Sequence, residues 1–130
     1  MSTELKSPQQ QIYDAVFLVA YNLGYSVFDY LPANEVSYPF VFVGEYFNND
    51  RKNKSFKYGN MVQIIHVYHD HKGRRELTSM IDKIKAECEQ LKRTENFYTT
   101  CKNTNDQVML DNSTGEPLLH GILEVEFQFH

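Results

Sequence analysis

Apolar and polar side chains alternate with a period of two along the segment Leu119 to Phe129. From Leu123 onward, apolar residues occupy every second position, with Glu124, Glu126 and Gln128 between them. Because successive side chains of a strand point to opposite faces, one face of this strand must be buried and the other solvated. That arrangement is typical of an antiparallel sheet that packs against helices.

A first helix is predicted to begin at Ser7 and Pro8 and to stop at Gly24. Ser is a favoured N-cap, Pro is tolerated at the first helical position, and Gly is a common C-terminal stop. Apolar residues recur at spacings of 4, 3 and 4: Ile12, Val16, Val19 and Leu23. Three more residues widen that apolar surface: Phe17, Leu18 and Tyr21. So wide a surface predicts a second contact, which is either a subunit interface or deep burial within this chain.

A second helix carries one apolar stripe at spacings of 4, 3, 4 and 3: Leu77, Ile81, Ile84, Cys88 and Leu91. Strands are predicted at 25–29, 38–45, 61–68, 97–101, 107–110 and 119–129. The predicted class is therefore α+β, an antiparallel or mixed sheet packed against two helices in the order α-β-β-β-α-β-β-β. A length of 130 residues predicts a single domain, 1–130. Within it we expect a short flexible N-terminus at 1–7 and a long flexible loop at 47–59.

Composition limits the functions that this chain can have. It contains no run of 18 apolar residues, and its N-terminus lacks a secretory pattern, so we expect an intracellular product that does not span a membrane. Two cysteines make no disulfide framework, and we expect both to be reduced and structural. A net charge of −4 argues against a dedicated nucleic-acid-binding protein.

The loop at 47–59 separates two strong strand signals and is unusually long for a hairpin connection. It carries a charge of +3, from Arg51, Lys52, Lys54 and Lys57 against Asp50, so the rest of the chain carries −7. It also contains three aromatic residues: Phe47, Phe56 and Tyr58. This composition suits either nucleic-acid contact, with cations for phosphates and rings for stacking, or a mobile arm that orders on a protein partner. A solvated hairpin tip is the third alternative.

No catalytic constellation is evident in this sequence. The group His66, His69, Asp70 and His71 contains suitable zinc or iron ligands, but on a continuing strand His66 points away from the other two histidines. The alternative is a polar connection in which Asp70 or His71 caps the second helix. Phosphate-binding loops and a nucleophile elbow are absent from the sequence, so we expect no enzyme activity and no cofactor.

Three segments, taken in order, resemble the siphophage tail completion proteins, which act as tail terminators. They are the strand Tyr38-Pro39-Phe40-Val41-Phe42-Val43-Gly44-Glu45, the helix start Gly73-Arg74-Arg75-Glu76, and His120-Gly121-Ile122-Leu123 before the last strand. The similarity spans residues 8 to 129, and the family often has Trp where this chain has Tyr68.

The resemblance implies a small α+β protein that forms a ring, commonly of six subunits, between the head connector and the tail tube. It implies no catalysis. We further expect a monomer before assembly, and DNA that passes through the ring without specific binding because the protein is acidic. The expected location is the head–tail junction of a virion that is assembled in the host cytoplasm. The residues that we expect at assembly contacts are Phe17, Tyr21, Phe47, Asn49, Arg51, Lys52, Lys54, Phe56, Lys57 and Tyr58. The alternatives are a nucleic-acid-binding module that uses the loop and a metal-dependent enzyme at His66–His71.

Overall fold

A computed structural model describes residues 5–32, 36–49, 59–113 and 115–130 of the chain. Two helices and a five-stranded sheet confirm the predicted α+β class. The elements in chain order are α1 (Pro8–Asn22), β1 (Val27–Phe28), β2 (Phe40–Asn49), β3 (Gly59–Asp70), α2 (Arg74–Glu89), β4 (Thr99–Asp111) and β5 (Leu118–Phe129).

The sheet is mixed and has the strand order β1-β2-β3-β5-β4. The short strand β1 pairs in parallel with β2, and the other pairings are antiparallel. The order of elements differs from the prediction because the two strands expected at 97–101 and 107–110 form one strand, β4. It pairs with β5 from Thr99 to Asp111, with a register shift between Cys101 and Asn103. Polar residues continue this strand because it lies at the sheet edge, where most of its side chains are exposed.

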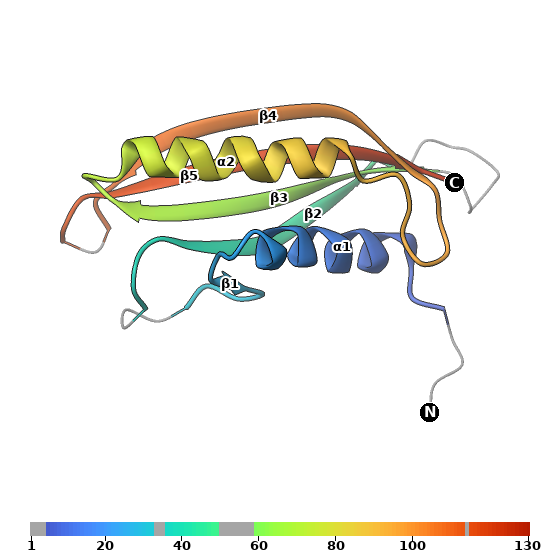
Figure 1. Ribbon diagram of the computed structural model, residues 1–130, viewed down its shortest axis with the longest axis horizontal. Helices are drawn as coiled ribbons and strands as arrows, with labels where there is room; N and C mark the ends of the chain where they lie inside the picture. Colours follow the sequence, from blue (N-terminus) through green and yellow to red (C-terminus); the bar gives the residue numbers. More distant parts are fainter. Residues whose placement is uncertain (1–4, 33–35, 50–58, 114) are drawn as a thin grey trace.

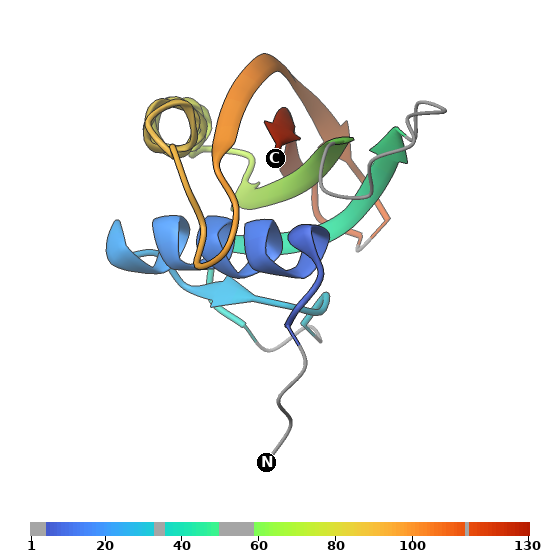
Figure 2. The same cartoon turned by 90° about the vertical axis from the view of Figure 1, so that its right-hand side faces the viewer.

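Both helices lie in front of the sheet in Figure 1 and share one hydrophobic core with it. Figure 2 shows α2 end-on and α1 side-on, so the two helix axes are far from parallel. The stripe of α2 packs closely on β5, because a Cβ atom at Gly121 would lie 2.6 Å from Cδ1 of Ile81. The period of two in β5 is confirmed, since Leu123, Val125 and Phe127 are fully buried.

The two helices begin differently. The Ser7 side chain caps α1 as predicted by accepting a hydrogen bond from the Gln10 N–H, and Gly24 follows the helix with a φ of 93°. By contrast, α2 has Gly73 at its N-cap and no side-chain cap. The prediction that Asp70 or His71 caps α2 is therefore wrong. Asp70 instead accepts a hydrogen bond from the backbone N–H of Lys72 within the tight turn before the helix.

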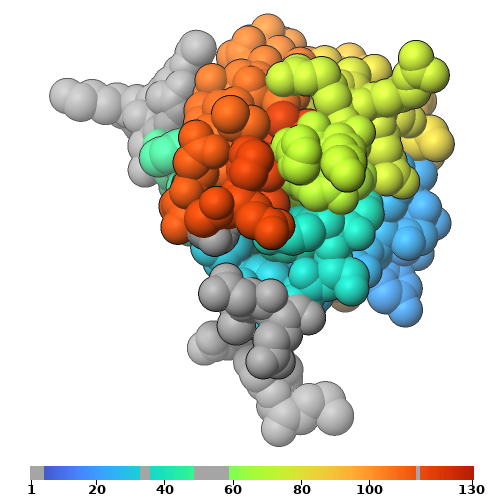
Figure 3. Space-filling model, turned by 90° about the vertical axis from the view of Figure 1, so that its left-hand side faces the viewer, coloured from blue at the N-terminus to red at the C-terminus, as the bar shows by residue number. Residues whose placement is uncertain are grey.

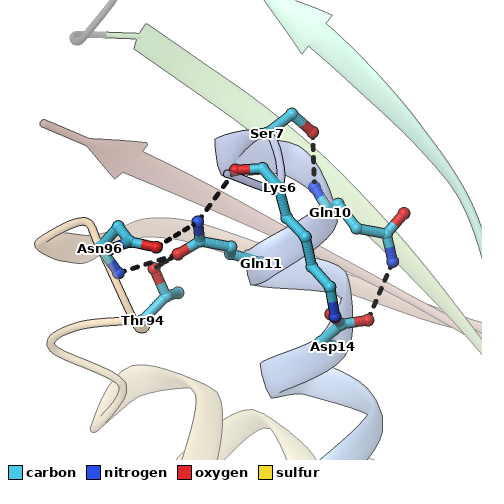
Figure 4. Close-up of polar contacts among 7 residues, drawn as sticks. All are labelled: Lys6, Ser7, Gln10, Gln11, Asp14, Thr94 and Asn96. Carbon is cyan, nitrogen blue, oxygen red and sulfur yellow. Dashed lines mark hydrogen bonds and ion pairs between the residues drawn. The ribbon is translucent and has the colours of Figure 1, made fainter. Parts of the chain in front are cut away.

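A buried glutamine ties the start of α1 to the connection between α2 and β4 (Figure 4). The Gln11 side chain is only 5% exposed, yet all its hydrogen-bonding capacity is used. Its Nε2 donates to the Lys6 carbonyl at 2.9 Å and to Asn96 Oδ1 at 3.0 Å, and its Oε1 accepts from the Thr94 hydroxyl at 2.8 Å and the Asn96 N–H at 2.9 Å. This bridge holds two segments together that are more than eighty residues apart.

Strands β2 and β3 extend further into the predicted 47–59 loop than the sequence indicated. Phe47, Asn48 and Asn49 belong to β2, and Gly59 begins β3. The rest of that loop, and the first four residues of the predicted flexible N-terminus, lie outside the described residues. Neither described helix is long and apolar enough to cross a membrane.

Candidate assembly surfaces

One face of the sheet carries no helix, and we call it the helix-free face. Strand register places the following residues on it: Phe40, Phe42 and Phe47 of β2; Asn60, Val62, Ile64, His66 and Tyr68 of β3; His120, Ile122, Glu124, Glu126 and Gln128 of β5; and Asn103, Asn105, Gln107 and Met109 of β4. None of these residues is Lys or Arg. The face changes from aromatic at one end of the sheet to amide-rich and acidic toward the other.

Stacked rings form the aromatic end of this face. Phe40 stacks on Tyr68 with 5.1 Å between ring centroids, and Tyr68 stacks on His120 at 4.3 Å. His120 also stacks on His66, with 5.0 Å between ring centroids, and His66 stacks on Phe42 at 5.2 Å. Burial raises the pKa of the Tyr68 hydroxyl. Because these rings come from three strands, they add cross-strand packing on the side that no helix covers.

A chain of polar contacts runs through the stacked rings. His66 Nε2 lies 2.8 Å from Glu45 Oε1, and His66 Nδ1 lies 2.8 Å from His120 Nε2. The hydrogen bond from His66 lowers the pKa of the Glu45 carboxyl, and burial together with the nearby His66 lowers the pKa of His120. Glu45 lies in the register shift between Val43 and Tyr46, and such irregularities re-aim side chains. Sequence reasoning missed this contact because no local pattern signals the shift.

The structure separates the histidines of the proposed metal group. His69 lies on the helix-covered face, where its Nε2 is 2.6 Å from Glu76 Oε1, whereas His66 is on the helix-free face. This confirms that His66 and His69 point to opposite faces. Within the described ranges, no set of three or more His, Cys, Asp or Glu residues is arranged to hold a metal ion.

The two thiols are poorly suited to nucleophilic chemistry. Cys88 is fully buried in the core, and burial raises its pKa to about 12. Burial also raises the pKa of Cys101. Both cysteines are free. Since the thiolate is the reactive form, these cysteines act as small hydrophobic residues.

Large apolar side chains of α1 are exposed on the side away from the sheet. Tyr21 is 62% exposed and Leu18 is 55% exposed. Phe17, the other α1 residue expected at an assembly contact, is half-buried against the core and lies 6.4 Å from the ring of Tyr13. The wide apolar surface of α1 is thus divided between the core and solvent.

The second expected contact region begins at the end of β2. Phe47 is 59% exposed there on the helix-free face. Its neighbour Asn48 accepts a hydrogen bond at 2.7 Å from Gln9 of α1, and Asn49 closes the strand opposite Asn60. The remaining expected residues lie outside the described part of the chain: Arg51, Lys52, Lys54, Phe56, Lys57 and Tyr58.

Charge also gathers on two surfaces to which the sequence assigned no assembly contact. Glu124 and Glu126 lie two positions apart on the helix-free face, and the exposed side of α2 begins with Arg74 and Arg75. The pair of arginines at a helix start was visible in the sequence. The sequence did not show that these arginines lie on the other side of the sheet from the acidic face, because that depends on which side of the sheet the helix covers.

No protein-family model matches the chain, and no curated protein matches it. Among solved structures, the chain is similar to a chain from the virion of a native gene transfer agent particle, with 13% sequence identity and a TM-score of 0.56. The match covers 95% of this chain and 92% of that chain. At this level of identity, the likeness shows a shared fold.

Proposed function

We propose that this protein is a structural protein of a phage-type virion that terminates the tail tube and joins the tail to the head connector. The observation that carries the proposal is the fold that it shares, over nearly the full length of both chains, with a chain of a gene transfer agent virion. The resemblance of residues 38–45, 73–76 and 120–123 to tail completion proteins supports the same role. The proposed location is the head–tail junction, after assembly in the host cytoplasm.

In this proposal, the free protein is a monomer of one domain that assembles into a ring, with six subunits as the expected number. Every subunit of a ring must offer two different surfaces, because the contacts are head-to-tail. The exposed apolar residues of α1 and the 47–59 arm take part in assembly, either with neighbouring subunits or with the tail tube protein. Exposed Tyr21 and Phe47 support this assignment, because large rings are enriched at the centres of interfaces.

DNA passes through the proposed ring without specific binding. The net charge of −4 supports this, because an acidic protein repels the phosphate backbone. The protein is expected to have no catalytic activity. In support, its described thiols are held in the protonated form and its described histidines form no metal-binding group.

The test is to remove the protein from the virus that encodes it and examine the particles by electron microscopy. Loss of the protein should leave filled heads unattached to tails, and immunogold labelling of wild-type virions should mark the head–tail junction. Normal virions without the protein would refute the proposal. Salt-dependent DNA binding by the purified protein, lost when the arm is shortened, would favour a nucleic-acid-binding module instead.

Deleting residues 49–57 tests the arm separately from the fold. We expect the shortened protein to remain a folded monomer and to fail in head–tail joining. A matched control replaces only the cations Arg51, Lys52, Lys54 and Lys57 by Gln, which keeps the length of the arm. Infectious particles made with the deletion variant would exclude the arm as an assembly element.

A further inference from the structure

The exposed side of α2 carries a stripe of polar and small residues that we call the α2 stripe. It consists of Arg74, Arg75, Thr78, Ser79, Asp82, Lys83 and Ala86. These residues are all exposed, and three cations against one carboxylate give the stripe a charge of +2. Because its middle is built from Thr78 and Ser79, another surface can approach the helix backbone closely there.

The two arginines of the stripe are placed against helix stability. They lie in the first turn of α2, where the positive end of the helix dipole disfavours cations. The residues three and four positions further on are Leu77, Thr78 and Ser79, so neither arginine has an acidic partner along the helix. Among the described residues, neither guanidinium forms an ion pair. Charges that oppose local stability point to a role in recognition.

The helix-free face has the opposite character. Glu124 and Glu126 lie on it, half-buried, two positions apart on β5. The amide of Asn103 donates to Glu126 at 3.0 Å, and within the described ranges no cation pairs with either carboxylate. Polar amides surround them, from Asn105 and Gln107 of the neighbouring strand. Two half-buried carboxylates that pair with no described cation provide a ready site for a basic partner.

The two surfaces lie on opposite sides of the sheet. The buried side of α2 packs against the helix-covered face of β5, where Gly121 meets Ile81, and the stripe points away from it. Figure 1 shows α2 in front of the sheet, and Figure 3 looks onto the end at which β3 turns into α2 beside the β4–β5 turn. One copy therefore cannot bring its own stripe onto its own carboxylates, whereas two copies can.

We propose that the α2 stripe of one copy docks on the acidic part of the helix-free face of a second copy, with Arg74 and Arg75 against Glu124 and Glu126. This inference rests on the proposed ring, to which it adds a contact between subunits besides those assigned to α1 and the 47–59 arm. The contact uses different surfaces on the two partners, so it is heterologous, and repetition of it closes a ring or extends a filament. Arginine suits this role because its planar fork binds a carboxylate with two hydrogen bonds.

Cysteine cross-linking tests the contact directly and captures it even where association is brief. One variant carries Ser79→Cys and the other carries Asn105→Cys, which lies opposite Glu124, and both carry Cys101→Ser. When the two are mixed under mild oxidation, a disulfide-linked heterodimer should form at least about tenfold faster than either variant links to itself. A matched control pairs Ser79→Cys with a cysteine at Gln90, the residue that follows α2. Heterodimer formation no faster than in this control would overturn the proposal.

Charge reversal identifies which groups make the contact. The pair Arg74→Glu and Arg75→Glu should abolish the fast cross-link, and so should Glu124→Arg with Glu126→Arg in the other partner. Combining both reversals should restore the cross-link, because the complementary charges are then exchanged. A failure to fold is separable, since glutamates at the start of α2 suit the helix dipole and should leave the melting temperature unchanged or raised. If the arginine reversals left the rate of the cross-link unaffected, these charges would not make the contact, and the proposal would fail.

The outcomes for this contact and for the proposed function are distinguishable. A protein that labels the head–tail junction but gives no heterodimer refutes the docking and leaves the function standing. A heterodimer that forms in a protein absent from virions refutes the function and leaves the docking standing.

Discussion

Replacing Gln11 by Leu should destabilise the protein, because it removes a buried hydrogen-bonding hub while nearly preserving side-chain volume. The Gln11→Leu change leaves the hydroxyl of Thr94 without its hydrogen-bond acceptor, which is Gln11 at 2.8 Å. Thr94 is only 8% exposed. The other two hydrogen-bond partners of Gln11, which are Lys6 and Asn96, are exposed and can bind water instead. A buried polar group without a hydrogen bond costs about 1–3 kcal/mol, so we expect the free energy of unfolding to fall by about 2 kcal/mol.

The loss is measurable by calorimetry. With an unfolding entropy of about 2.1 cal/mol/K per residue, a 130-residue chain has about 0.27 kcal/mol/K, and 2 kcal/mol lowers the melting temperature by about 7 °C. Gln10→Leu, on the exposed side of the same helix, is the matched control and should cost less than about 0.5 kcal/mol. Adding Thr94→Val to Gln11→Leu should recover much of the loss, since both polar groups are then gone. A strictly additive double variant, or an unchanged melting temperature for Gln11→Leu, would refute this reasoning.

Three further predictions concern pH, thiol reactivity and packing. Because the pKa of His120 is lowered on folding, the unfolded chain takes up the proton first, and stability should fall as the pH drops below about 6.5. Urea unfolding from pH 7.5 to 5 should show a shallower fall for His120→Gln, and identical slopes would contradict the assignment. In a Cys101→Ser background, Cys88 should resist iodoacetamide at pH 8 until the protein unfolds, because its pKa is about 12, and mass spectrometry would reveal rapid labelling if this is wrong. Gly121→Val should cost about 1–3 kcal/mol by forcing Ile81 out of place, and an unchanged urea midpoint would show that α2 moves freely.

Local patterns in the sequence predicted most of the elements. The stripe from Leu77 to Cys88 and the alternation along 119–129 each repeat over several turns or residue pairs, so the helix and the strand needed no tertiary information. Ser7 and Gly24 likewise marked the limits of α1 through backbone chemistry alone. The weaker predictions fall where the pattern is polar. The prediction divides strand β4 in two because its middle, from Lys102 to Asp106, looks like a loop, and only pairing with β5 makes it a strand.

The candidate surfaces depended more heavily on the tertiary structure. The sequence marked the exposed ring of Tyr21 in α1 and the start of the 47–59 arm, because such residues stand out from a local pattern. It did not predict that Glu45 meets His66, since that contact depends on a register shift, nor that His66 meets His120, since two strands must first pair.

The sequence by itself therefore determined the fold class, the two helices, the solvated face of the last strand and the acidic balance, because each follows from residue types along one stretch of chain. Only the tertiary structure decided that the arginines of α2 and the glutamates of β5 lie on opposite sides of one sheet. The physical reason is that a helix buries its apolar stripe on whichever face the strand pairing makes apolar, and this choice places the two charged surfaces back to back.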